Sequence, residues 1–239
     1  MVACGLALGS MVQAAAATED ADAPGASAGA GAVAMPTRQR AELRLADFGQ
    51  ERASPEARRI AHWALHSGDS GGLPYMIVDK AQARVLVFDR HGQLQGAGPA
   101  LLGMERGDGT AQGIGSRQLS AIAPQERTTP AGRFVASLAP DLKGQEILWI
   151  DYDSALALHR VAKGKPAERR AERLQSASAD DNRISYGCIN VPVPFYETVV
   201  SPAFKQSSGV VYILPETRRA EDVFGSYDVE VAAAAEGQR

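Results

Sequence analysis

Short apolar segments separated by turn residues constrain the fold of this chain more than any other feature of its sequence. From Pro74 onward, these segments are rich in Val, Ile, Leu and aromatic residues, which favour strands. Glycine, proline and charged residues lie between them, and few long helical patterns interrupt them. We predict strands over residues 76–78, 84–89, 134–136, 147–152, 155–159 and 210–214. The pattern predicts a mainly β fold of the β-sandwich or open-barrel class, with a few short helices.

The clearest helix signal lies at residues 54–72, before the first strand. Ser54 is a capping residue, Pro55 suits the first helical position, and Glu56 follows near the positive end of the helix. His62 and His66 are four residues apart and share one side of this helix. Because no third metal ligand accompanies them, we expect histidines at the core edge or in solvent. Shorter helices are predicted over residues 167–174 and 193–204.

The N-terminal residues have the composition of a secretory signal. Residues 1–17 are apolar and end in an alanine run, although no Lys or Arg precedes the apolar stretch. They are too short for a membrane span, so we predict no transmembrane span in the mature chain. Residues 18–53 are predicted to be a flexible Ala/Gly/Pro-rich tether followed by a charged arm. We therefore expect export to the periplasm or cell envelope.

Length and charge limit the remaining organisation. At 239 residues the chain can form one sizeable domain, which we place at residues 73–216, with an acidic, alanine-rich tail at 217–239. The formal net charge is −3, which argues against a general nucleic-acid-binding protein.

Cys188 is the most informative single residue. Removal of the predicted signal would also remove Cys4 and leave Cys188 as the only cysteine, so no intramolecular disulfide could form. A lone cysteine is commonly a small buried hydrophobe, but Gly187 places this one in a short turn between a polar and an apolar segment. A thiol in that position can be exposed and reactive. His159, at the end of a predicted strand, is the histidine best placed in the sequence to act as its base.

Two further segments bear on the site. Residues 103–115 form a glycine-rich loop without the lysine-serine pair of a phosphate-binding loop, so we expect a mobile loop beside a substrate groove. The charged stretch at 163–181 carries Arg169, Arg170 and Arg173. These arginines could cover an acceptor site, but we favour a solvated helix face.

Three motifs in order carry a resemblance to a known family. Residues 77–80, 85–89 and 91–92 resemble its opening strands, and Thr129-Pro130-Ala131-Gly132-Arg133-Phe134 resembles its Thr-Pro-x-Gly-x-Phe turn. His159 followed by Ser185-Tyr186-Gly187-Cys188-Ile189-Asn190 resembles its histidine and Ser-His-Gly-Cys signature. Residues 73–215 thus resemble an L,D-transpeptidase catalytic domain of the YkuD type. Tyr186 in place of histidine, and the long interval between His159 and Cys188, mark a divergent branch.

The resemblance implies a YkuD-like β-sandwich or open barrel and a cysteine-dependent peptidoglycan L,D-transpeptidase. Cys188 is then the nucleophile and His159 the general base, with no metal or organic cofactor. Its partners are the donor and acceptor stem peptides of peptidoglycan, and carbapenem-type inhibitors are expected to react with it.

The residues around the motif suggest their own roles. The N–H groups of Gly187, Cys188 and Tyr186 are candidates for an oxyanion hole. The Tyr186 hydroxyl could donate to the oxyanion or substrate, or its ring could form a wall of the groove. Arg183 could grip a substrate carboxylate, and Ser185 and Asn190 are further predicted substrate-binding residues.

Two other functions fit the same sequence. A peptidoglycan L,D-carboxypeptidase or other hydrolase would form the same thioester and pass it to water. An inactive cell-wall binding module would keep the fold without the chemistry, an alternative supported by Tyr186 and the long insertion.

Overall fold

The computed structural model describes residues 42–237. The predicted signal peptide and residues 18–41 of the predicted tether lie outside this range.

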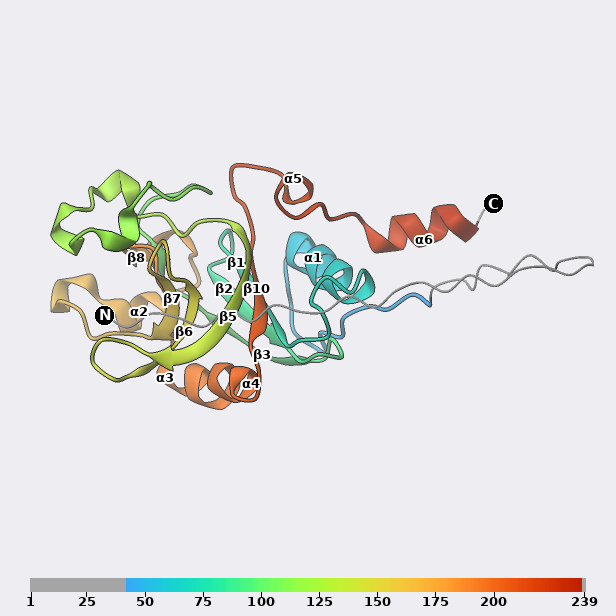
Figure 1. The fold of residues 1–239 in the computed structure, drawn as a ribbon, viewed down its shortest axis with the longest axis horizontal. Coiled ribbons are helices and arrows are strands. Elements are labelled where there is room, and N and C mark those ends of the chain that lie inside the picture. The colour runs from blue at the N-terminus through green and yellow to red at the C-terminus, as the bar shows by residue number, and fades with distance from the viewer. Residues whose placement is uncertain (1–41, 238–239) are drawn as a thin grey trace, which may run out of the picture. The chain divides into compact units, whose positions relative to one another are not determined.

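An eight-stranded sheet dominates the fold (Figure 1) and confirms the predicted mainly β class. Its strand order is β3-β2-β1-β10-β5-β6-β7-β9. In chain order the strands are β1 Tyr75–Asp79, β2 Arg84–Phe88, β3 Leu94–Pro99, β5 Gly132–Pro140, β6 Glu146–Asp151, β7 Leu156–Arg160, β9 Ile189–Val191 and β10 Gly209–Ile213.

The two edges of this sheet approach each other, which gives it a barrel-like form. Leu101, just after β3, forms a bridge with Asn190 of β9. The Leu101 N–H donates to the Asn190 carbonyl at 2.8 Å, and the Asn190 N–H donates back at 2.9 Å. A small parallel pair, β4 Leu102–Gly103 and β8 Arg183–Ser185, lies next to this bridge in the sequence. The connection brings the segment before Cys188 against the segment after β3.

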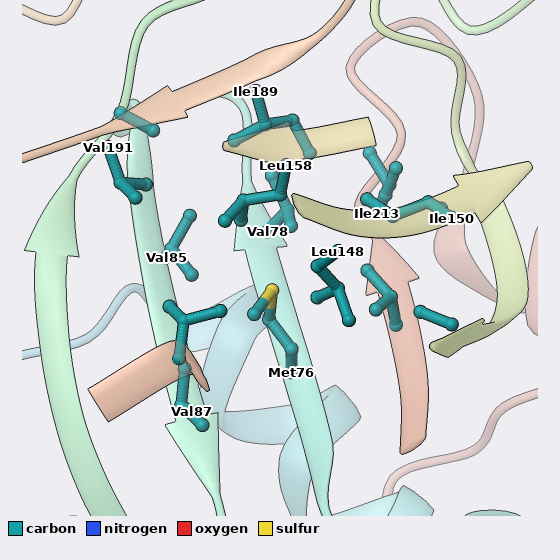
Figure 2. Packing of buried hydrophobic residues seen from close by; sticks show 14 of the residues in the cluster. Met76, Val78, Val85, Val87, Leu148, Ile150, Leu158, Ile189, Val191 and Ile213 are labelled. Atoms are coloured by element: carbon teal, nitrogen blue, oxygen red, sulfur yellow. The ribbon is translucent and has the colours of Figure 1, made fainter. Parts of the chain in front are cut away.

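Alternation along the strands creates two apolar clusters, one on each face of the sheet. Inward-facing residues such as Met76, Val85, Leu158 and Ile189 form the barrel interior (Figure 2). Their neighbours on the opposite face, including Tyr75, Ile77, Phe88 and Tyr212, pack with helix α1 Pro55–His66. This two-residue period is the one expected for strands buried on both faces.

The predicted N-terminal helix is present as α1 and begins as expected. The Ser54 hydroxyl accepts a hydrogen bond from the Ala57 N–H at 3.1 Å and donates one to Asp79 at 2.5 Å. Ser54 therefore caps the helix and ties it to the end of β1. The two histidines of α1 accept hydrogen bonds from the preceding arm, His62 from the Ala46 N–H and His66 from the Arg44 N–H.

The other helices are short. A continuous helical segment follows β9, comprising α3 Val193–Phe195, a π-helical turn Tyr196–Val200 and α4 Ser201–Phe204. Tyr196, Val200 and Phe204 project from it into the barrel interior. The helix predicted over 167–174 is limited to α2 Arg170–Arg173, and the C-terminal part contains α5 Ala220–Phe224 and α6 Val229–Gly237. Among the described helices, none has the length and apolar character needed to cross a membrane.

Candidate active site

Cys188 lies immediately before β9, at the edge where β9 pairs with β7. The two strands run parallel with Leu158 opposite Ile189 and His159 opposite Asn190. Leu158 and Ile189 face the core, so His159 and Asn190 occupy the other face. Cys188 is two residues before Asn190, which places it on this outer face near the start of β7.

The loop that carries Cys188 requires glycine. Gly187 has a φ of +133°, and a Cβ added to it would lie 2.8 Å from the Thr128 carbonyl oxygen. Both the backbone conformation and the close approach exclude a larger residue. Ser185 stabilises the same loop, because its hydroxyl donates to the Cys188 carbonyl at 2.6 Å and accepts from the Gly187 N–H at 3.1 Å.

The Cys188 thiol is partly exposed. Its Sγ lies 3.5 Å from the Ala155 carbonyl oxygen. Burial of the sulfur within the loop raises the pKa of the thiol, and the Ala157 N–H opposes that effect only in part. The thiol form therefore predominates near neutral pH, so nucleophilic attack would require a base.

A pocket of about 180 Å³ opens beside the thiol. Aliphatic side chains make up much of its wall, and Cys188, Gly187 and Tyr186 line one part of it. Its one charged lining residue, Arg117, is paired with Glu126 by two hydrogen bonds at 2.9 and 3.1 Å. The other lining residues are Thr110, Ile114, Gly115, Leu119, Ile122, Thr128, Pro130, Ser154, Ala155 and Leu156.

Different parts of the glycine-rich loop at 103–115 line the pocket and contact the buried Lys80. Thr110, Ile114 and Gly115 line the pocket, in keeping with a loop beside a groove. Gly107 and Asp108, by contrast, are hydrogen-bonded to the buried Lys80 ammonium. The middle of the loop is thus anchored, which differs from the mobile loop expected from its glycine content.

His159 is half-buried and holds a defined tautomer. Its Nδ1 lies 2.8 Å from the Arg160 carbonyl oxygen, which can only accept, so Nδ1 carries the proton and Nε2 has the basic lone pair. Burial lowers the pKa of His159, and the nearby Arg170 lowers it further. The imidazole is therefore neutral near pH 7, the form needed in a base.

The structure does not join His159 directly to the thiol. Among residues 42–237, no hydrogen bond links the two side chains, and His159 is not part of the pocket lining. In the register of the parallel strands β7 and β9, His159 is opposite Asn190, two residues beyond Cys188. Cys188, Gly187 and Tyr186 thus gather at one pocket, and His159 lies one position further along the same face.

The insertion at 163–181 contacts this face through Arg170, so the expectation of a solvated arginine face is wrong for Arg170. Only 13% of the Arg170 side chain is exposed, and its guanidinium donates to Asn190 Oδ1 at 3.0 Å and to Glu168 at 2.6 Å. Arg173 donates to the Glu168 and Asp181 carbonyls, whereas Arg169 remains 70% exposed. Arg170 therefore fastens the insertion to the strand that follows Cys188.

The three predicted substrate-binding residues are buried and bonded within the protein. Ser185 and Asn190 are 3% and 1% exposed, and both donate to the Cys188 carbonyl. The Arg183 guanidinium contacts Glu216 at 2.6 Å instead of lining the pocket. Because these groups already have internal partners, we infer that they stabilise the Cys188 loop and do not contact substrate.

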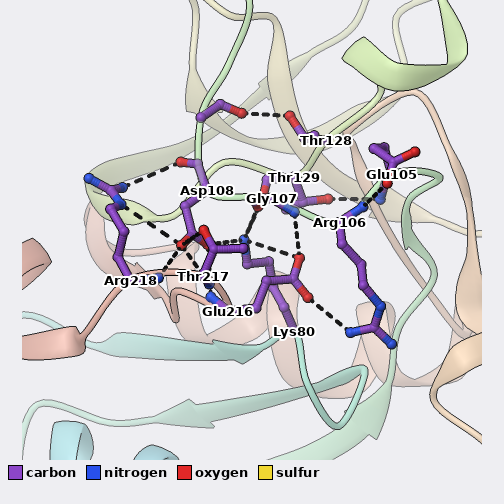
Figure 3. Close-up of polar contacts among 12 residues, drawn as sticks. Lys80, Glu105, Arg106, Gly107, Asp108, Thr128, Thr129, Glu216, Thr217 and Arg218 are labelled. Carbon is purple, nitrogen blue, oxygen red and sulfur yellow. Dashed lines mark hydrogen bonds and ion pairs between the residues drawn. The ribbon is translucent and has the colours of Figure 1, made fainter.

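A buried polar network lies behind the Cys188 loop (Figure 3). Local sequence patterns do not indicate it. Lys80 is fully buried and contacts Asp108 at 2.9 Å and Glu216 at 3.6 Å. Burial would raise the pKa of Asp108, but hydrogen bonds from Thr217, Glu216 and Lys80 outweigh it and hold that pKa well below the usual value. The sequence places Lys80 beside a strand but gives no signal of its two carboxylate partners, which come from distant segments.

Among the described residues, no group of three or more His, Cys, Asp or Glu side chains could hold a metal ion.

Comparison with known proteins gives fold neighbours of low similarity. No protein-family model and no curated protein matches the chain. A structure of the L,D-transpeptidase LdtMt1 in complex with imipenem has 15% identity and a TM-score of 0.34, covering 59% of this chain and 58% of that one. An L,D-transpeptidase from Mycobacterium smegmatis has 13% identity and a TM-score of 0.35, with the same two coverages. The catalytic domain of an E. faecium L,D-transpeptidase has 17% identity and a TM-score of 0.34, covering 59% of this chain and 96% of that one.

This chain thus spans less than two thirds of the length of the first two neighbours. Likeness of this degree defines neither a reaction nor a substrate.

Proposed function

We propose that this protein is a cysteine acyltransferase of the cell envelope, exported through its N-terminal segment, that cross-links peptidoglycan stem peptides as an L,D-transpeptidase. The observation that carries the proposal is the partly exposed Cys188 thiol, held at the rim of a pocket by a loop that requires Gly187. The sequence around it, from Ser185 to Asn190, supplies the resemblance to the family.

In the first step, the Cys188 sulfur attacks the carbonyl carbon of an L-residue in the donor stem. The thiol proton passes to a base, for which His159 with its basic Nε2 is the candidate. The bond to the following residue breaks, and the departing amine takes the proton. A thioester then joins the donor to Cys188.

The developing oxyanion needs hydrogen-bond donors. The Gly187 N–H is already bonded to Ser185, so we assign this role to the N–H groups of Cys188 and Tyr186. In the second step, an amine of the acceptor stem attacks the thioester carbonyl, the C–S bond breaks, and a new amide forms. Release of the thiolate and its reprotonation complete the cycle.

Incubation of the full-length protein with a defined disaccharide tetrapeptide tests the proposal, with products identified by mass spectrometry. The Cys188→Ala variant is the negative control, and Cys4→Ala is the matched cysteine control. We expect cross-linked dimer from the wild type and Cys4→Ala, and none from Cys188→Ala. Loss of a terminal residue without dimer would indicate the hydrolase, and no product would favour the inactive binding module.

A carbapenem is a second probe of the same thiol. One neighbouring L,D-transpeptidase structure contains imipenem. Opening of the β-lactam by Cys188 would add the whole mass of the drug, since no atom leaves when the ring amide breaks. We expect this adduct on Cys188.

A further inference from the structure

We infer that Thr129, held in place by Lys80, is a positioning residue that aims the Cys188 N–H at the oxyanion during acyl transfer. The inference rests on the proposed function only in taking Cys188 as the residue that accepts an acyl group. It goes beyond the cysteine motif, residues 185–190, because Thr129 lies outside that motif, does not line the pocket and does not contact the thiol.

Thr129 joins three segments through its hydroxyl and its backbone. The side chain is completely buried. Its hydroxyl accepts from the Gly103 N–H at 2.8 Å and donates to the Gly187 carbonyl at 2.7 Å. Because the hydroxyl has one proton and the Gly103 N–H can only donate, that proton must be directed to Gly187.

This bond fixes the orientation of one particular peptide group. The Gly187 carbonyl and the Cys188 N–H belong to the same peptide unit, which is trans, since the described residues contain no cis peptide bond. In a trans peptide the C=O and the N–H point in opposite directions. The hydrogen bond from Thr129 directs the Gly187 carbonyl toward the interior, so the Cys188 N–H points away from the interior.

In the described part of the chain, the Cys188 N–H has no acceptor on another residue and lies near only its own sulfur, so it can donate to a substrate oxygen. Within residues 42–237, it donates to no backbone carbonyl or side-chain acceptor of another residue. Gly187 offers no competing N–H, because its own is bonded to Ser185 at 3.1 Å. The orientation set by Thr129 thus acts on one of the few N–H groups left beside the thiol.

Lys80 immobilises Thr129 from behind. Its buried ammonium donates to the Thr129 carbonyl at 2.9 Å, to Asp108 at 2.9 Å and to the Gly107 carbonyl (Figure 3). The same network reaches the other side of the cysteine loop, since Arg183 donates to the Lys80 carbonyl at 2.9 Å. Because all three ammonium donors are used and water is excluded, rotation of Thr129 would break buried bonds.

Two reactions of the Cys188 thiol distinguish an effect on the orientation of the Cys188 N–H from an effect on the accessibility of the thiol. Acetylation by p-nitrophenyl acetate passes through a tetrahedral oxyanion, in which sulfur bonds to the carbonyl carbon before p-nitrophenolate leaves. Alkylation by iodoacetamide displaces iodide at a saturated carbon and forms no oxyanion. A residue that orients an oxyanion donor should affect the first reaction and leave the second unchanged.

The test compares both rates in full-length wild type, Thr129→Val and Thr129→Ser, with Cys188→Ala as the blank. We expect Thr129→Val to lower acetylation about 10- to 100-fold, because the donor remains but is no longer oriented. The alkylation rate of Thr129→Val should stay within about twofold of the wild-type rate. Thr129→Ser keeps the hydroxyl and should be acetylated at the wild-type rate. If Thr129→Val does not fold, Thr129→Ala carries the same expectation without added volume.

If Thr129→Val lowers the acetylation and alkylation rates equally, Thr129 has only a structural role and the inference is wrong. If it lowers neither rate, the inference is also wrong. A wild type that is alkylated but never acetylated would overturn it as well. Neither reagent requires recognition of peptidoglycan. Normal acetylation without any product from stem peptides would therefore contradict the proposed function and leave the positioning role measurable.

Discussion

The guanidinium of Arg127 lies over the ring of Tyr186, with its central carbon 4.0 Å from the ring centre. The same guanidinium donates twice to the Ile122 carbonyl, at 3.0 and 3.1 Å. Ile122 and Tyr186 both line the pocket beside Cys188. Arg127 therefore connects two parts of the pocket wall, the cysteine loop at Tyr186 and the turn at Ile122.

This contact predicts which part of Tyr186 matters. Tyr186→Phe keeps the ring and should retain the acylation rate of Cys188 within about twofold. Tyr186→Leu removes the ring and should lower that rate about two- to fivefold, the fold-change that corresponds to the energy of a partly exposed cation–π contact. Single-turnover acylation measured for both variants checks this. An equal loss in Tyr186→Phe would instead show that the hydroxyl takes part in the reaction.

The pKa shifts at the site predict a pH profile. A raised thiol pKa means that alkylation of Cys188 by iodoacetamide should have its midpoint above that of a free cysteine, ~8.5. The lowered pKa of His159 keeps the base neutral, so the acid limb of acylation should fall below the ordinary histidine value of ~6.5. Rate–pH profiles of wild type and His159→Gln test this. An unchanged acid limb in the variant would exclude His159 as the titrating base.

The insertion offers a matched pair of arginines. Arg170→Ala removes the partner of the buried Asn190 Oδ1 and should lower the free energy of unfolding by about 1–3 kcal/mol. Arg169→Ala removes an exposed ion pair, and its effect should stay within about 0.5 kcal/mol. Urea unfolding of both variants measures the difference. Equal effects would mean that the insertion does not depend on the Asn190 contact.

The strands and the position of Cys188 after a glycine turn could be predicted because their signals are local. Val85 and Leu86 are consecutive residues of an apolar strand segment and lie on opposite faces of the sheet. Gly187, beside Cys188, indicates a turn with a positive φ angle. The support of the site could not be predicted in this way. Lys80 follows β1, Glu216 follows the adjacent parallel strand β10, and Asp108 comes from the loop after β4, so only the tertiary structure brings these three groups together. The sequence likewise predicts substrate contact for Arg183, because its partner Glu216 lies outside any local motif.

Stability should depend on pH through α1. Burial lowers the pKa of His62, and the neutral Nδ1 accepts the Ala46 N–H at 3.0 Å. The unfolded chain then binds the proton more tightly than the native protein. This contribution is therefore complete above the unfolded pKa of ~6.5 and is lost as pH falls through the lower native value.

Urea unfolding between about pH 7.5 and 5 tests the role of His62. Wild type should lose more free energy of unfolding across this range than His62→Gln, which cannot titrate. Parallel losses in the two proteins would assign the pH dependence to other groups.

The central claim is that Cys188 accepts an acyl group, and an intact-mass measurement with peptide mapping tests it most directly. Full-length wild type and Cys188→Ser are incubated with a carbapenem, and iodoacetamide labelling of parallel samples reports access to the thiol. The account predicts one whole-drug adduct, located on Cys188 in the wild type and absent from Cys188→Ser. A Cys188 that iodoacetamide alkylates but that neither the carbapenem nor a stem peptide acylates would contradict the account.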